Sequence, residues 1–166
     1  MTSLQPIIRL VADEDIEELV QLSLAAWAPV FRTFEEIYGP RLYRLLRPEG
    51  LDGQRAVVED MCRDRVRFHA YLAEVEGRAA GFVVVQLRHE ELMGEVQLLA
   101  VHPDFQNQGV AAALNEFALH FMRKNGMKVA MVETGGDPSH APARRSYEKA
   151  GYTLSPIARY FKDLTE

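Results

Sequence analysis

The hydrophobic pattern of this chain changes near residue 65, and this change restricts the fold more than any other feature. Before it, apolar side chains recur with the period of a helix, at Ile16, Leu19, Val20 and Trp27. Two further amphipathic stretches cover about residues 34–46 and 55–64. The first part of the chain is therefore predicted to form three helices, preceded by a strand at Pro6–Val11.

The second part alternates strands and helices. Phe68–Glu74 and Ala79–Leu87 flank a tight turn and predict a β-hairpin, and the apolar segment Glu95–Val101 predicts a central strand. The later elements are a helix from Val110 to Gly126, a strand at Val129–Val132, a helix at Ala141–Ala150, and one or two strands between Tyr152 and Leu164. This order favours an α/β (α+β) fold, with a mixed central sheet flanked by helices on both faces in a single domain over residues 1–166.

Composition argues against several classes of function. The net charge is −5, whereas a nucleic-acid-binding protein needs a basic face for the phosphates. No apolar run approaches the roughly 20 residues that cross a bilayer, so no membrane partner is expected. Cys62 is the only cysteine, is expected to be buried, and the five histidines lack the spacing of metal ligands. Because of this histidine spacing, no metal is expected. Residues Met1 to Pro6 lack the features of a secretory signal, so we expect a cytoplasmic protein.

The segment with the most chemical content runs from Val101 to Ala111, between a strand and a helix. The first N–H groups of a helix have no partner inside it and lie at the positive end of the helix dipole, so they can donate hydrogen bonds to a bound phosphate. Gly109 and Ala111 would let a ligand approach the backbone closely. The pattern lacks the lysine of a P-loop and the additional glycines of a dinucleotide fingerprint. On these residues alone, the glycine is either part of a phosphate site or an ordinary helix cap.

Two blocks of sequence together resemble the GNAT superfamily of N-acetyltransferases. The first, Val101-His102-Pro103 followed by Gln106-Asn107-Gln108-Gly109-Val110-Ala111, is similar to the acetyl-coenzyme A motif of that family. The second, Ala143 to Tyr152, is similar to its later Ala-x-x-x-Tyr-Glu-Lys-x-Gly-Phe signature. The resemblance is good over about residues 68–164 and covers the first 65 residues only in the order of their elements. It implies a GNAT-type fold and acetyl-coenzyme A as the acyl donor.

The resemblance also implies where acetyl-coenzyme A binds. The pantetheine arm should contact backbone groups of Leu99, Ala100 and Val101, as a parallel strand would. The pyrophosphate should lie on the helix start, held by the Gln106 side chain and by the backbone of Asn107, Gln108, Gly109, Val110 and Ala111. The family often has an asparagine, seven residues before its tyrosine, that contacts the pantetheine. This chain has His140 there, and a histidine can still hydrogen-bond to the cofactor.

Acetyl transfer to an amine needs a base, because an alkylammonium with a pKa near 10.4 is almost wholly protonated at pH 7. Tyr147 matches the family's tyrosine near the leaving thiolate. We expect it to donate a hydrogen bond rather than its proton, since a phenol is a weaker acid than a thiol. Glu95 is the leading base: the histone-acetylating branch places a glutamate eleven residues before Gln106, and regular alternation would put it on the face of Leu99 and Val101. Glu133 is the second candidate, and a water relay is the third.

The predicted function is direct transfer of an acetyl group from acetyl-coenzyme A to a primary amine of a small molecule. A cationic metabolite and an amino-sugar antibiotic are both compatible with the net charge of −5. Two alternatives stay open: transfer to a protein amino group, and an acyl-coenzyme A sensor without turnover. The sequence does not identify the acceptor, and it leaves a homodimer open.

Overall fold

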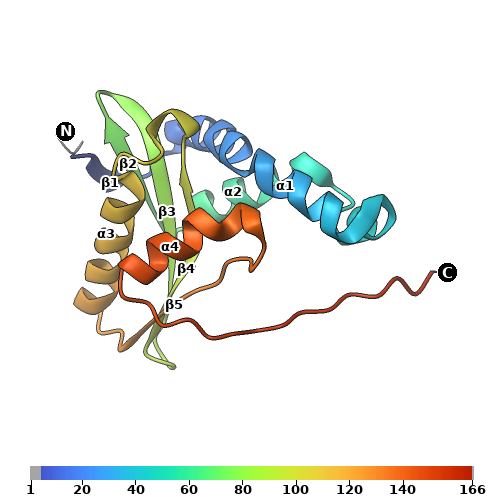
Figure 1. Ribbon diagram of the computed structural model, residues 1–166. Coiled ribbons are helices and arrows are strands. Elements are labelled where there is room, and N and C mark those ends of the chain that lie inside the picture. Colours follow the sequence, from blue (N-terminus) through green and yellow to red (C-terminus); the bar gives the residue numbers. More distant parts are fainter. Residues whose placement is uncertain (1–4, 166) are drawn as a thin grey trace.

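The computed structural model describes residues 5–165, so residues 1–4, which belong to the segment inspected for a secretory signal, lie outside it. At its centre is a sheet of five strands in the order β1-β2-β3-β4-β5 (Figure 1). Their bounds are Ile7–Leu10, His69–Val75, Arg78–Arg88, Met93–Val101 and Val129–Val132. Neighbours from β1 to β4 are antiparallel, whereas β4 and β5 are parallel.

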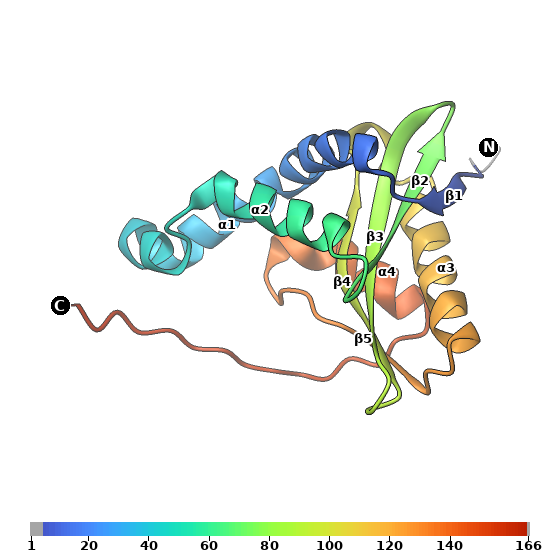
Figure 2. The same ribbon diagram turned by 180° about the vertical axis from the view of Figure 1, so that it is seen from behind.

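Helices cover both faces of this sheet (Figures 1 and 2). On one face lie α1 (Ile16–Leu46) and α2 (Gly50–Arg63), and on the other lie α3 (Val110–Lys124) and α4 (Ala141–Lys149). Three short 3-10 turns complete the described structure: η1 (Asp13–Asp15), η2 (Pro103–Phe105) and η3 (Pro138–His140). The mixed sheet with helices on both faces confirms the predicted fold class.

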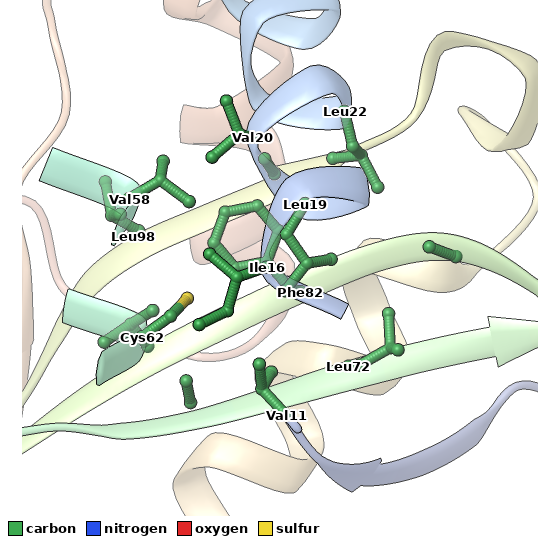
Figure 3. Packing of buried hydrophobic residues seen from close by; sticks show 14 of the residues in the cluster. Val11, Ile16, Leu19, Val20, Leu22, Val58, Cys62, Leu72, Phe82 and Leu98 are labelled. Atoms are coloured by element: carbon green, nitrogen blue, oxygen red, sulfur yellow. The ribbon is translucent and has the colours of Figure 1, made fainter. Parts of the chain in front are cut away.

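Each face of the sheet has its own apolar core. In Figure 3, Ile16 and Leu19 of α1 pack over Phe82 of β3, and Cys62 of α2 lies in the same cluster. The second core lies under α3 and includes the fully buried Leu114. Burying a side chain of this size contributes about 1.5–3 kcal/mol, so the amphipathic patterns that predict the helices also fix which side each helix covers.

Cys62 is buried, with 2% of its surface exposed, as expected. Burial raises the pKa of its thiol to about 11, so the thiol stays protonated and unreactive near neutral pH. Within residues 5–165, no helix is long and apolar enough to cross a membrane.

The first two predicted helices belong to one helical run, α1, which continues through the expected break between Trp27 and Phe34. The run is interrupted later, at Gly39, where φ is 72° and ψ is 160°. Pro40 follows, and a proline ring disfavours the helical conformation in the residue before it. The position of the break is therefore set by the Gly39–Pro40 pair rather than by a gap in the hydrophobic pattern.

The strands expected between Tyr152 and Leu164 are not formed, so this prediction is wrong for the described tail. After α4 the chain leaves the sheet and extends toward the far end of α1 (Figures 1 and 2). There Arg41 pairs with Asp163 at 2.7 Å. Pro156 lacks the N–H that a strand donates to its neighbour, and apolar side chains such as Tyr160, 90% exposed, find no core to enter.

Helix α3 meets the sheet in close contact at Gly81 of β3. A Cβ atom at this position would lie 2.8 Å from the carbonyl oxygen of Ala100, and 3.1 Å from the side chains of Val110 and Leu114. Only a residue without a side chain fits here. Gly81 thereby brings the end of β4 and the start of α3 together.

Candidate functional site

Strand β4 continues beyond the end of its parallel partner β5. Their pairing covers only Met93–Val96 and Val129–Val132. Beyond it, Leu98–Val101 pairs with β3 on one side, and Gln97–Val101 has no strand partner on the β5 side within residues 5–165. Free N–H and C=O groups on a strand edge bind an extended ligand by adding it as a further strand. Leu99, Ala100 and Val101, the predicted pantetheine contacts, lie on this free edge.

A β-bulge interrupts β4 at the same point. Val84 of β3 pairs with Leu98, and the next residue, Val85, pairs with Val96. Gln97 is therefore an extra residue with no partner of its own in the register. The alternation of side chains along β4 restarts at this bulge.

The bulge changes the face on which Glu95 lies. Val96 packs in the core under α3, together with Leu99 and Val101, whereas Leu98 packs in the core under α1 and α2. Because Glu95 points opposite to Val96, it shares the face of Leu98. The expectation that Glu95 shares a face with Leu99 and Val101 is wrong, since it assumed unbroken alternation.

Both candidate glutamates bind arginines. The Glu95 carboxylate accepts a hydrogen bond from Arg88, and its side chain is 13% exposed. Glu133 follows β5, is 62% exposed, and accepts a hydrogen bond of 2.9 Å from Arg159.

The turn before α3 leaves the first N–H groups of the helix without a helical partner. Gly109, at the N-terminus of α3, has a φ of 89°, which a residue with a side chain adopts only under strain. The first bond of the helix runs from Ala113 N–H to the Gly109 carbonyl, at 3.0 Å. The N–H groups of residues 110–112 consequently have no partner within the helix. The Gln106 amide donates to the Val101 carbonyl at 3.3 Å and so ties the turn to β4.

One cavity of about 660 Å³ joins the start of α3, the free edge of β4, the end of β5 and the helices α1 and α4. Ten of the residues predicted for the site line it: Leu99, Ala100, Val101, Gln106, Asn107, Gly109, Ala111, Glu133, His140 and Tyr147. Three others do not, namely Gln108, whose amide donates to the Asp104 carbonyl, Val110, which is buried, and Glu95. Most of the predicted site residues therefore line one cavity, although the elements that carry them are far apart in the chain.

Tyr147 presents a neutral phenol to this cavity. Burial and the neighbouring Tyr152 raise its pKa to about 12, so the hydroxyl stays protonated at neutral pH. The two rings meet edge to face, with their centroids 5.8 Å apart. A hydroxyl held in this state is a hydrogen-bond donor for a developing anion.

His140 is paired with an aspartate that the sequence analysis did not identify. Its Nδ1 lies 2.6 Å from Oδ2 of Asp137, and the two side chains are 17% and 9% exposed. The His140 ring also packs against Phe34 of α1, with centroids 5.6 Å apart. The Asp-x-x-His spacing in residues 137–140 could have indicated this pairing, because a 3-10 turn such as η3 places residues three apart on the same side of the turn.

Comparisons with known proteins agree on one family. A family model described as Acetyltransferase (GNAT) family matches residues 28–152. The mycothiol acetyltransferase of Thermomonospora curvata is 36% identical over 83 residues, which are 50% of this chain and 27% of that protein. The Streptomyces coelicolor protein of the same name is 34% identical over 82 residues, 49% of this chain and 26% of its own length. The chain therefore spans about a quarter of the length of these relatives.

Solved structures share the fold at lower identity. The PaiA N-acetyltransferase of Thermoplasma acidophilum, in complex with coenzyme A, has a TM-score of 0.72 and 16% identity, covering 93% of this chain and 94% of its own. AAC(6')-Iy, in complex with a bisubstrate analogue, has a TM-score of 0.67 and 16% identity, covering 96% and 98%. These likenesses concern the fold, whereas the family model covers most of the sequence. The chain belongs to the acetyltransferase (GNAT) family.

Proposed function

We propose that this protein transfers an acetyl group from acetyl-coenzyme A directly to a primary amine of a small molecule. The observation that carries the proposal is that the start of α3 and the free edge of β4 open into one cavity, which Tyr147 also lines. A donor with phosphates at one end and amide groups along an extended arm is complementary to these two features.

The residues present suit such a donor. The N–H groups of residues 110–112 would hold the pyrophosphate, and the positive φ of Gly109 leaves the backbone bare beside them. The unpaired edge of Gln97–Val101 would hydrogen-bond to the pantetheine amides. Acetyl-coenzyme A supplies the activated thioester in this scheme, and the protein supplies position, a proton acceptor and a donor to the leaving sulfur.

Tyr147 is the proposed donor to the leaving thiolate. Its pKa of about 12 exceeds the value of about 8.5 for a free thiol, so the hydroxyl would share its proton in a hydrogen bond rather than surrender it. Preorganised donors of this kind stabilise charge where it develops in the transition state.

Three observations favour a small amine as acceptor. The cavity that would hold the donor arm and the acceptor together measures about 660 Å³, which is in the range of small-molecule sites. The chain carries a net charge of −5, which favours a cationic acceptor. The curated relatives are named for mycothiol, and the bisubstrate analogue of AAC(6')-Iy contains acetylneamine. Transfer to a protein amino group is the alternative within the same chemistry.

Two measurements on the parent protein test the proposal. Calorimetry should detect coenzyme A binding, and free thiol should be released from acetyl-coenzyme A in the presence of neamine, spermidine or a short peptide with a free amino group. Release with a small amine supports the proposal, and release with the peptide alone assigns a protein acceptor. Binding without release from any of them identifies a sensor, and absence of binding refutes the site.

A further inference from the structure

We propose that His140 is the general base of the transfer and that Asp137 positions it. This inference rests on the proposed function and identifies the atom that accepts the proton of the acceptor amine. It also gives His140 a different role from the cofactor contact that the family resemblance implies.

The geometry of the pair leaves one imidazole nitrogen available to a ligand. Nδ1 lies 2.6 Å from the Asp137 carboxylate, which accepts the hydrogen of Nδ1. A neutral imidazole with its proton on Nδ1 has a lone pair on Nε2. Because His140 lines the cavity, this lone pair is the basic atom that the ring offers to an amine there.

Asp137 is held in its ionised form. Burial alone would raise its pKa, but hydrogen bonds from Ser139 and His140 outweigh this effect and lower it. Ser139 donates through its backbone N–H at 3.0 Å and also through its hydroxyl. An aspartate of this kind keeps the histidine in one tautomer and stabilises the imidazolium that forms when a proton is taken up.

The loop around the pair is built to bring the two side chains together. Arg144 of α4 donates to the carbonyls of Gly135 and Asp137 at 2.6 and 2.7 Å. A Cβ atom on Gly135 would collide with Asp137 Oδ2 and lie 2.5 Å from His140 Nδ1. A Cβ atom on Gly136, the next residue, would meet no atom within 4 Å. The two adjacent glycines therefore differ in the space around them, and only Gly135 must lack a side chain for Asp137 and His140 to meet.

The surrounding charged groups leave His140 as the better-placed base. Phe34 of α1 covers one side of the ring, and Arg47 lies over Phe34, 5.1 Å from its centroid. Arg145, Tyr147 and Lys149 of α4 and Glu133 after β5 line the same cavity, and Arg144 is bound to the loop carbonyls. The two glutamates considered above are each bound to an arginine, and Glu95 is outside the lining.

An ammonium acceptor loses one proton to His140 Nε2, which passes it to solvent. The neutral nitrogen attacks the thioester carbonyl, so a C–N bond forms and the C–S bond breaks, with its electron pair leaving on sulfur. The second nitrogen proton ends on that sulfur, and the Tyr147 hydroxyl donates a hydrogen bond to the sulfur while its charge develops. The products are the N-acetyl amine, coenzyme A as thiol, and one proton.

His140→Asn separates the proposed role from a cofactor contact. Asparagine is the residue that the family often has here, and its amide still hydrogen-bonds to a pantetheine arm but takes up no proton. With neamine and acetyl-coenzyme A, we expect kcat/KM at pH 7 to fall by about 10²–10⁴-fold, while the coenzyme A Kd changes less than about twofold. The loss should shrink as pH approaches the pKa of the amine. Unchanged kcat/KM, or a loss of coenzyme A affinity that accounts for the lost rate, would overturn the proposal.

The glycine pair supplies a matched control. Gly135→Ala should lower turnover by displacing the aspartate from the histidine, whereas Gly136→Ala should behave as the parent. Nitrogen-15 NMR of histidine-labelled protein gives a readout without any acceptor: His140 should show the Nδ1–H tautomer in the parent and lose it in Asp137→Ala. An Nε2–H tautomer in the parent refutes the pairing.

The two levels of failure differ. If the parent protein releases no thiol with any of the amines tested, the proposed function is refuted. An active parent whose His140→Asn variant keeps its rate refutes this inference alone.

Discussion

Replacing Tyr147 with phenylalanine removes one hydroxyl from the cavity and keeps the ring that packs against Tyr152. With a Tyr147 pKa of about 12 and a thiol pKa of about 8.5, full protonation of the thiolate would be uphill by about 5 kcal/mol. A hydrogen bond to a charged acceptor contributes about 1.5–3 kcal/mol. We therefore expect kcat to fall about 10- to 150-fold in Tyr147→Phe, with little change in coenzyme A affinity.

The assay is thiol release from acetyl-coenzyme A with neamine between about pH 7 and 10, beside calorimetry with coenzyme A. The raised pKa keeps the Tyr147 hydroxyl protonated as pH rises toward about 12, so its ionisation should produce no falling limb in this window. Tyr152→Phe is the control, because that residue is outside the cavity lining and its buried hydroxyl has no hydrogen-bond partner in the described structure. An unchanged kcat in Tyr147→Phe, where chemistry limits turnover, refutes the reasoning, as does an equal loss in both variants.

Other substitutions test the remaining parts of the site. Gly109→Val should weaken coenzyme A binding by about tenfold or more, because a β-branched residue at a φ of 89° is strained and crowds the anion site. Gly126→Val is the control, because its φ of 83° imposes similar strain away from the anion site. It should lose similar thermal stability and keep the parent's affinity for coenzyme A. Equal coenzyme A affinities in the two variants would contradict the anion site. If His140 is the base, Glu95→Gln and Glu133→Gln should keep most of the turnover, and a roughly 100-fold loss that high pH rescues would assign the base to that glutamate instead. Cys62, with a pKa of about 11, should react with a disulfide reagent at pH 8 only after unfolding; fast reaction of the folded protein would contradict its burial.

Local signals predicted most of the elements. Val129–Val132 has the expected bounds, because a short apolar run between polar segments is visible in the sequence itself. The bulge at Gln97 is different, since it is defined by which residues of β3 stand opposite β4. No pattern within β4 records that pairing, and the face assigned to Glu95 was wrong for this reason.

The site was predictable to the extent that its residues act through the local backbone. Gly109 lies in a strand–turn–helix context that is visible in the sequence, and the structure places it at the N-terminus of α3. Asp137 was missed because its importance depends on the pairing with His140 and on the space at Gly135. The prediction of strands after Tyr152 was wrong for a different reason. A strand forms only beside a neighbouring strand, and the sequence of one segment does not specify whether such a neighbour lies within reach.

Gly81 has a consequence for how mutational data on this protein should be interpreted. It is outside the cavity lining, yet a Cβ atom there would press on the Ala100 carbonyl and the Val110 side chain. Those contacts fix the spacing between the strand that would carry the pantetheine and the helix that would carry the pyrophosphate. A screen scored by activity would therefore rank Gly81 with the ligand contacts. Measuring stability and coenzyme A affinity separately would show that such a variant alters the distance between two half-sites and removes no chemical group from either.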